Sequence, residues 1–238
     1  MKEGQGPSAK GQENKLPVHG FVLAGGKSAR MGADKALLEF RGRTLVEIAV
    51  EKLRGFCAEV SIAGNREDLS AFAPVVQEER LGCGPAAGIE AGLKAARQEW
   101  AMFVPVDVPL VPGELLRRWA ERVIAANEDA EAVEAMGPLL GDRLKVLGRS
   151  QPAFCILRHE VLATVSAALD RGELRLEAIF DATRWDLGVA AVVEMDAAEI
   201  DLERRPTSVE LEHWFLNVNT PQELVKAEAW VNADPLRG

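Results

Sequence analysis

The chain has 238 residues, of which 47% are hydrophobic and 27% charged, a composition that agrees with one large globular α/β domain. Its formal net charge of −9 argues against a nucleic-acid-binding protein, because such proteins need a basic face. No apolar run approaches the ~20 residues of a membrane span, and the N-terminus has no apolar secretory core. We therefore expect a cytoplasmic protein without membrane or nucleic-acid partners. Its three cysteines, odd in number and widely spaced, favour a reducing compartment.

The N-terminal segment differs in composition from the rest of the chain. Residues 1–16 are rich in Gly, Gln, Lys and Glu, and we expect a disordered tail there. Residues 17–238 are expected to form a single domain. It opens with an apolar run of strand length over 18–24.

A loop rich in glycine and cations comes after that strand. Gly25 and Gly26 remove side chains where the backbone leaves the strand, so bare N–H groups can face an anion. The same short loop carries Lys27, Arg30 and Lys35. Amides that hold oxygens, combined with cations that offset their charge, predict a phosphate-binding loop.

Other interpretations of this loop are an ordinary glycine turn with solvated lysines, or one of two nucleotide motifs. A Walker A loop needs a glycine where Phe21 stands, so its register fails, although Gly26-Lys27-Ser28 fits the end of the motif. A Rossmann G-x-G-x-x-G pattern does not fit this loop either.

The next hundred residues alternate between helical and strand patterns. The near-continuous apolar run over 100–107 is typical of a strand buried on both faces of a parallel sheet. Helices are expected over 44–54, 85–98 and 114–126, and extended segments over 36–40, 59–63, 74–77 and 100–107. The alternation predicts a doubly wound, mostly parallel α/β sheet.

Polar residues and glycines come after several of these strands. Asn65 and Glu78 come after the second and third, a loop with Gly82 and Gly84 comes next, and Asp107 ends the fourth. Ligands of doubly wound sheets bind beyond the carboxyl ends of the strands, so we expect these residues to converge on one site.

The second glycine loop also suggests a dehydrogenase. Gly82-x-Gly84-x-x-Ala87, with Asp107 downstream, fits a loose dinucleotide fingerprint. This alternative is less favoured, because Pro85 interrupts the pattern and the loop is not the first strand–helix turn.

Beyond residue 130 the pattern is weaker. Strands are expected over 130–136 and 189–195, and helices over 159–170 and 173–181. The acidic segment 196–212 is expected to be an insertion and receives no function. Thr220 and Glu223 have the spacing that caps a final helix.

Leu23 to Lys35 resembles the signature L-A-G-G-x-S-x-R-M-G-x-D-K of the molybdenum cofactor guanylyltransferases and matches it at every fixed position. Three further segments resemble that family: 84–89 its G-P-x-x-G-I, 217–221 its N-V-N-T-P, and 151–157 its Q-P-L-F-A-L, with Ala153 in place of leucine. The resemblance implies a Rossmann-like fold of the nucleotide-diphospho-sugar transferase type.

The resemblance also implies a reaction, in which GMP passes from GTP to molybdopterin and pyrophosphate leaves, with Mg²⁺ as cofactor. It implies catalytic roles for Arg30, Lys35 and Asp107, with Asp107 as the metal ligand. The implied binding residues are Leu23, Ala24, Gly25, Gly26, Lys35, Asn65, Glu78, Gly84, Pro85, Asp107, Asn217 and Asn219. Molybdoenzymes or cofactor-delivery proteins are implied as further partners.

Two departures from the family pattern concern the substrates. Glu78 stands where the family commonly has aspartate, and residues 138–148 match poorly, which leaves the molybdopterin side undefined. Relatives that transfer cytidylate typically read L-A-A-G where this chain has Leu23-Ala24-Gly25-Gly26, so the resemblance favours guanine. The competing functions are a cytidylyl- or sugar-phosphate nucleotidyltransferase of the same fold and a non-catalytic nucleotide-binding regulator.

Overall fold

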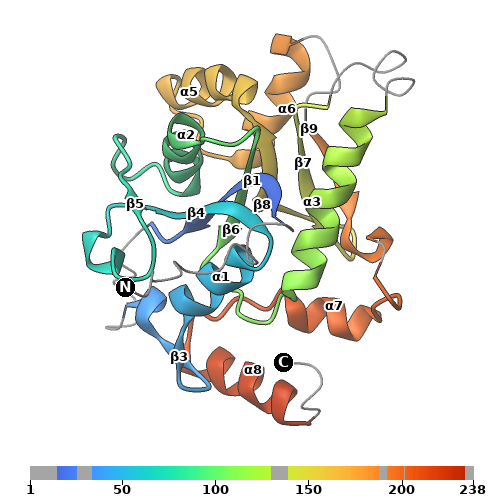
Figure 1. Cartoon of the computed structure of the whole chain (residues 1–238). Helices are drawn as coiled ribbons and strands as arrows, with labels where there is room; N and C mark the ends of the chain where they lie inside the picture. Colours follow the sequence, from blue (N-terminus) through green and yellow to red (C-terminus); the bar gives the residue numbers. More distant parts are fainter. Residues whose placement is uncertain (1–14, 26–33, 130–138, 188–191, 201, 234–238) are drawn as a thin grey trace, which may run out of the picture.

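The fold is built on a seven-stranded sheet with helices on both faces (Figure 1). The computed structural model describes residues 15–25, 34–129, 139–187, 192–200 and 202–233. The strands are β1 (Leu16–Leu23), β4 (Cys57–Ala63), β5 (Val75–Val76), β6 (Trp100–Pro105), β7 (Gly141–Val146), β8 (Arg149–Arg158) and β9 (Val192–Asp196). Their order is β5-β4-β1-β6-β8-β7-β9, and β8 runs antiparallel to both neighbours while the other pairs are parallel. The expectation of a mostly parallel sheet is confirmed.

Two separate hydrophobic clusters show that the sheet is covered on both faces. Side chains of successive strand residues alternate between faces, so Val22 belongs to one cluster while Phe21 and Leu23 belong to the other. The first cluster takes in buried residues of α1 (Leu45–Arg54), α3 (Gly113–Glu128), α7 (Ser208–Trp214) and α8 (Pro221–Ala233). The second takes in those of α2 (Pro85–Ala95), α5 (Leu162–Asp170) and α6 (Leu176–Leu187). The doubly wound arrangement is therefore confirmed.

The structure shifts several expected boundaries. β1 begins at Leu16, which pairs with Cys57, so the ordered domain starts before residue 17, and residues 1–14 of the expected tail lie outside the described residues. In the segment 36–40, a 3₁₀ turn, η2 (Lys35–Leu37), precedes the two-residue strand β2 (Glu39–Phe40), because Asp34 caps the turn by accepting from the amide of Ala36 at 3.0 Å.

The weaker C-terminal expectations fared less well. The strand expected over 130–136 lies outside the described residues, and β7 was missed because its sequence, GDRLKV, alternates poorly. The acidic segment 196–212, which was expected to be an insertion, packs as part of the domain. Ala197, Ile200 and Leu211 lie in the core, and Thr207 with Glu210 forms a capping box for α7. A few apolar residues anchor this segment despite its acidic composition.

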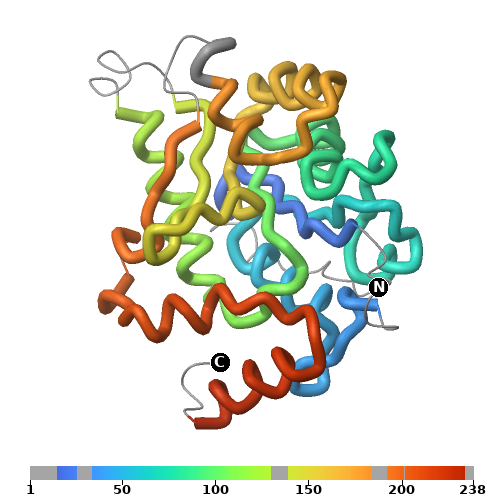
Figure 2. The backbone as a smooth tube through the Cα atoms, turned by 180° about the vertical axis from the view of Figure 1, so that it is seen from behind, coloured from blue at the N-terminus to red at the C-terminus, as the bar shows by residue number. Residues whose placement is uncertain are grey.

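The carboxyl ends of β1, β4, β5 and β6 share one edge of the sheet, since these strands are parallel. The view from behind shows the segment between α7 and α8 running along the end of β6, where the amide of Val218 donates to the carbonyl of Asp107 at 2.7 Å (Figure 2). Among the described residues, no helix combines the length and the apolar character that crossing a membrane requires.

Candidate active site

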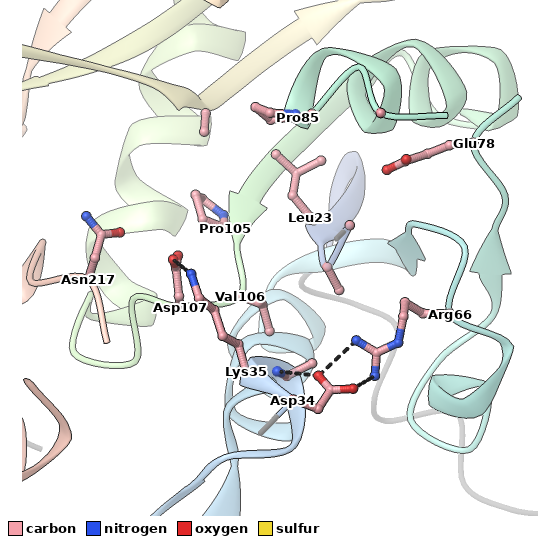
Figure 3. Close-up of a pocket in the computed structure, with 16 residues that line it drawn as sticks. Leu23, Asp34, Lys35, Arg66, Glu78, Pro85, Pro105, Val106, Asp107 and Asn217 are labelled. Atoms are coloured by element: carbon pink, nitrogen blue, oxygen red, sulfur yellow. Dashed lines mark hydrogen bonds and ion pairs between the residues drawn. The ribbon is translucent and has the colours of Figure 1, made fainter. Parts of the chain in front are cut away.

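A cavity of about 520 Å³ opens at the shared carboxyl edge of the strands (Figure 3). Nine residues of the expected site line it: Leu23, Ala24, Gly25, Lys35, Glu78, Gly84, Pro85, Asp107 and Asn217. Gly82, from the second glycine loop that was expected to reach the site, also lines the cavity, and residues outside the expected set complete the wall: Asp34, Ala36, Arg66, Pro105, Val106 and Ala153. Gly26 and Arg30 lie outside the described residues, so their roles stay predictions.

A second cavity, of about 670 Å³, is larger but contains none of the expected residues. It lies between the hairpin of β2 and β3 (Arg43–Thr44), the segment that leads into α3, and α7. Its two carboxylates already have arginine partners, Glu114 with Arg118 and Glu210 with Arg204. The cavity at the strand ends is therefore the candidate site, as expected for a doubly wound sheet.

At one end of the site, Lys35 joins residues of two other segments through an ion pair and a hydrogen bond. Lys35, the first residue of η2, lies with its Nζ 3.5 Å from Oδ2 of Asp107, and it also donates to Oδ1 of Asn219. Asp107 follows β6, and Asn219 precedes α8, so three separate segments meet here. Asn219 is not part of the cavity wall but accepts from Lys35, which is, and its expected role as a binding residue stays a prediction.

The cap of α8 holds Asn219 in place. Oε2 of Glu223 accepts from the amide of Asn219 at 2.7 Å and from the hydroxyl of Thr220 at 3.0 Å, and the amide of Glu223 donates back to that hydroxyl at 3.2 Å. The predicted Thr220–Glu223 cap is confirmed, and it fixes a residue that touches Lys35.

Arg66 was not predicted as a site residue. Its side chain is only 3% exposed and forks between two carboxylates, with contacts to Asp34 at 2.5 and 2.9 Å and to Asp68 at 2.7 and 3.0 Å. Because Asp34 directly precedes Lys35, Arg66 ties the end of the first glycine loop to the residues after β4. The one signal in the sequence was its position next to Asn65 at the end of a strand.

The other end of the site holds the half-buried carboxylate of Glu78, which points towards Leu23 (Figure 3). A Cβ on Gly25 would lie 2.7 Å from Oε1 of Glu78, and one on Gly88 would lie 3.2 Å from it, so glycine at both positions makes room for this side chain. Burial raises the pKa of the Glu78 carboxyl. Within the described part of the chain, no group donates a hydrogen bond to this carboxylate.

Asn65 acts on Glu78 through the backbone. Its carboxamide donates to the carbonyl of Glu78 at 3.2 Å and accepts from the amide of the same residue at 3.0 Å. Asn65 is exposed and is not part of the cavity wall, so the structure shows its contact with Glu78, and its expected role as a binding residue stays a prediction.

The second glycine loop brings a helix end to the cavity. Gly82 and Gly84 line the cavity with φ values of 77° and 61°, which side chains other than glycine rarely adopt. Pro85 occupies the first turn of α2, where its missing N–H costs nothing. The N-terminus of α2 therefore borders the cavity, and such helix ends favour anions.

The polar groups of the cavity also fit a magnesium ion bound together with a substrate. No group of three or more His, Cys, Asp or Glu side chains among the described residues offers a cage made of protein alone. Mg²⁺ is commonly held by one or two carboxylates together with substrate phosphates. Asp107 supplies such a carboxylate, and Asn217 lines the same cavity.

Comparison with known proteins agrees with this geometry. Residues 20–184 match the family model of the MobA-like NTP transferase domain. Molybdenum cofactor guanylyltransferases are similar along most of the chain. The protein from Vibrio cholerae is 31% identical over 86% of this chain and 88% of its own length, and that from Acidovorax ebreus is 32% identical over 87% and 93%.

Solved structures agree on the fold. Molybdopterin-guanine dinucleotide biosynthesis protein A from Archaeoglobus fulgidus superposes with a TM-score of 0.68 and 21% identity, covering 90% of this chain and 99% of its own. A 2-C-methyl-D-erythritol 4-phosphate cytidylyltransferase from Thermus thermophilus has a TM-score of 0.54 and 18% identity over 92% of this chain and 99% of its own. The fold thus serves different bases, but the matches along the sequence are specific. The chain belongs to the MobA-like NTP transferase family and, within it, to the molybdenum cofactor guanylyltransferases.

Proposed function

We propose that this chain transfers the GMP moiety of GTP to molybdopterin in the cavity at the strand ends. A terminal phosphate oxygen of molybdopterin attacks the α-phosphorus of GTP, and the bond from that phosphorus to the bridging oxygen breaks. Pyrophosphate leaves with the electron pair. One observation carries the proposal: a single cavity has the Lys35–Asp107 pair at one end and the Glu78 carboxylate, to which no described residue donates, at the other.

The chemistry needs no protein nucleophile, so the residues act by positioning and by charge. Lys35 is placed to hold a phosphate oxygen of the triphosphate and to offset the charge that develops on pyrophosphate. Asn219 and Asp107 orient the ammonium group from two directions. The N-terminus of α2 adds its dipole, and the first glycine loop with Arg30 is expected to complete the cradle.

Asp107 is the proposed ligand of Mg²⁺, with Asn217 beside it in the cavity wall. When bound, the ion neutralises phosphate charge and orients the triphosphate. Before the ion binds, Lys35 is the charged partner of Asp107.

Glu78 is the proposed base reader. Guanine presents two adjacent donors, N1–H and the exocyclic amine, which one carboxylate accepts together, whereas cytosine has no such pair. Cytosine would offer this half-buried carboxylate at most one of the two donors that guanine presents, and an acceptor left unpaired costs ~1–3 kcal/mol or more. Glu78 therefore favours guanylyl over cytidylyl transfer within a fold that serves both.

The acceptor is proposed to bind on the side of Asn217 and Ala153, beyond the Lys35–Asp107 pair. Cys57, Cys83 and Cys155 are free thiols, which supports work in the reducing cytoplasm. A molybdoenzyme or a cofactor-delivery protein is the proposed receiver of the product.

The test combines the protein with GTP, Mg²⁺ and molybdopterin and monitors both products. We expect a guanine dinucleotide of the pterin, identified by mass, and one pyrophosphate for each dinucleotide. Asp107→Ala is the matched negative control. GTP stabilising the protein against heat without any product in this mixture would support the nucleotide-binding regulator instead.

A further inference from the structure

The loop from Glu78 to Gly84 has little to hold it on the side of the cavity. Its Leu81 is 79% exposed, and Gly82 and Gly84 carry no side chains. Yet this loop supplies Glu78, Gly82 and Gly84 to the cavity wall. Its position must therefore be set by contacts made elsewhere.

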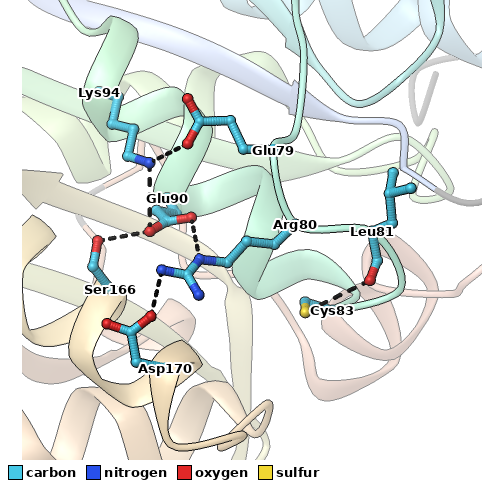
Figure 4. Close-up of polar contacts among 8 residues, drawn as sticks. All are labelled: Glu79, Arg80, Leu81, Cys83, Glu90, Lys94, Ser166 and Asp170. Carbon is cyan, nitrogen blue, oxygen red and sulfur yellow. Dashed lines mark hydrogen bonds and ion pairs between the residues drawn. The ribbon is translucent and has the colours of Figure 1, made fainter.

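Those contacts lie behind the loop, in a cluster of charged side chains that are absent from the cavity wall (Figure 4). Nε of Arg80 donates to Oε2 of Glu90 on α2 at 3.0 Å, and its Nη2 lies 2.7 Å from Oδ1 of Asp170 on α5. One guanidinium thus ties the loop to two helices that cover the same face of the sheet.

Glu90 is the buried centre of this cluster. Its side chain is 2% exposed, yet it receives the hydroxyl of Ser166 at 2.7 Å and the ammonium of Lys94 at 3.6 Å, in addition to Arg80. Burial pushes the pKa of this carboxyl upward, but the hydrogen bonds from Ser166 and Arg80 outweigh burial and leave the pKa below its usual value. Glu90 is therefore ionised at neutral pH, and its partners are needed to keep it so.

Glu78 lies between this cluster and a second anchor. On the cluster side, Glu79 accepts from Lys94 at 2.7 Å, and Arg80 follows it directly. On the other side, the Asn65 carboxamide holds both the amide and the carbonyl of Glu78. The backbone is thus fixed on both sides of the carboxylate that faces the cavity.

We propose that the Arg80–Glu90 ion pair is a positioning device for base selection, setting the place of the Glu78 carboxylate and of the 82–84 loop against guanine. This inference rests on the proposed function. Two parallel hydrogen bonds to one base edge tolerate little displacement, because each bond weakens steeply as its distance and angle leave the favoured range. An anchor that touches neither substrate can therefore control specificity.

The experiment measures kcat and KM for GTP and CTP in Arg80→Met and Glu90→Gln, beside wild type. We expect Arg80→Met to raise the KM for GTP and to lower the GTP-to-CTP ratio of kcat/KM by about tenfold, with kcat for GTP within about twofold. Glu90→Gln keeps the shape and loses the charge, so we expect a smaller change in the same direction. Arg80→Lys should restore part of the ratio.

Asp170→Asn is the matched control, because Asp170 contacts the same guanidinium but is 65% exposed. We expect it to leave the ratio within about twofold. Melting curves for each variant separate displacement from unfolding, and Glu90→Gln decides the matter if Arg80→Met does not fold.

An unchanged ratio and an unchanged KM for GTP in folded Arg80→Met and Glu90→Gln would overturn the inference. Failure of the proposed function gives a different result, since wild type would then show no preference for GTP. In that case the positioning role of the Arg80–Glu90 pair is tested by the KM of whichever nucleotide the protein uses. A KM equal to that of wild type in both variants would overturn that role.

Discussion

The two ends of the cavity are built in opposite ways. At the proposed phosphate end, each charged side chain that the structure describes already has a protein partner: Lys35 has Asp107 and Asn219, and Arg66 has Asp34 and Asp68. At the proposed base end, Glu78 is held through its backbone, while no described residue donates to its carboxylate. Under the proposed function this contrast separates two tasks: the triphosphate would compete with protein contacts, whereas the base would supply donors to Glu78.

This difference has a physical reason. Phosphates and Mg²⁺ carry high charge, so a site for them needs both cationic and anionic side chains. In the absence of ligand these side chains neutralise each other as ion pairs. A base is neutral and interacts through hydrogen bonds. A carboxylate that already accepts hydrogen bonds from protein groups would gain little net free energy by exchanging them for those of the base. Changes at the phosphate end should therefore abolish turnover, whereas changes at the base end should alter which nucleotide is used.

The largest effect is expected from Asp107→Ala. Loss of the proposed metal-holding carboxylate should lower kcat/KM for GTP by about 10²–10³ or more, in the range found when one electrostatic group of an active site is removed. The melting temperature should stay close to that of wild type, because Asp107 lies in the cavity wall rather than in the core. Pyrophosphate release and a melting curve check both. Asp181→Asn, at an exposed carboxylate outside the cavity wall, is the control. Near-normal turnover of Asp107→Ala would remove this residue from catalysis.

Lys35→Ala should weaken binding of GTP by about 1.5–3 kcal/mol, the usual worth of a hydrogen bond to a charged group, and leave guanosine binding nearly unchanged. Titration of both ligands against Lys35→Ala measures the difference, with Lys145→Ala, outside the cavity, as control. Equal losses for GTP and guanosine would mean that Lys35 acts on structure rather than on phosphate.

Arg66→Met should act on stability first. The substitution removes two contacts each from Asp34 and Asp68. Both aspartates keep access to water, so we expect a loss of about 1–3 kcal/mol in the free energy of unfolding. Breaking a fully buried ion pair would cost more. Denaturant titration measures it. Because Asp34 precedes Lys35, the KM for GTP should rise as well, and a destabilised variant with an unchanged KM would limit Arg66 to folding.

Glu78→Gln is expected to stabilise the protein, by less than Arg66→Met destabilises it. Burial raises the pKa of Glu78 in the folded state, so the folded protein holds this proton more tightly than the unfolded chain does. The stability that Glu78 contributes is present below its unfolded pKa and is lost as pH rises through the folded value. Glu78→Gln should therefore melt above wild type at pH 7.5, with the gap closing towards pH 4. A lower melting temperature at pH 7.5 would show that an ionised Glu78 stabilises the fold.

The sequence predicts the phosphate end better than the anchors around it. The strand-to-glycine pattern before Lys35 and the buried run before Asp107 are local signals, and both residues line the cavity as expected. A motif marks a residue without telling which way its side chain faces: Asn219 and Asn65 contact Lys35 and Glu78, while their expected contacts with a ligand stay predictions.

Arg66 and the Arg80–Glu90 pair show a second limit. Asp34 lies 32 residues from Arg66, and Glu90 lies 10 residues from Arg80. No local pattern joins an arginine to a carboxylate across a sheet edge or from a loop to a helix. For the fold, β7 and the segment 196–212 were missed for a related reason. Their few apolar residues are buried by strands and helices that are distant in the chain, so no local pattern marks them as core residues.

The most direct test of the account is the ratio of kcat/KM for GTP to that for CTP, with molybdopterin as acceptor, in wild type and in Glu78→Ala. We predict a preference for GTP of at least about tenfold in wild type and a clear reduction in the variant, because cytosine lacks one of the two donors that guanine offers to the carboxylate, and an unpaired acceptor costs ~1–3 kcal/mol or more. Equal use of both nucleotides by wild type would contradict the guanine assignment. An unchanged ratio in Glu78→Ala would contradict the division of the cavity into a phosphate end and a base-reading end.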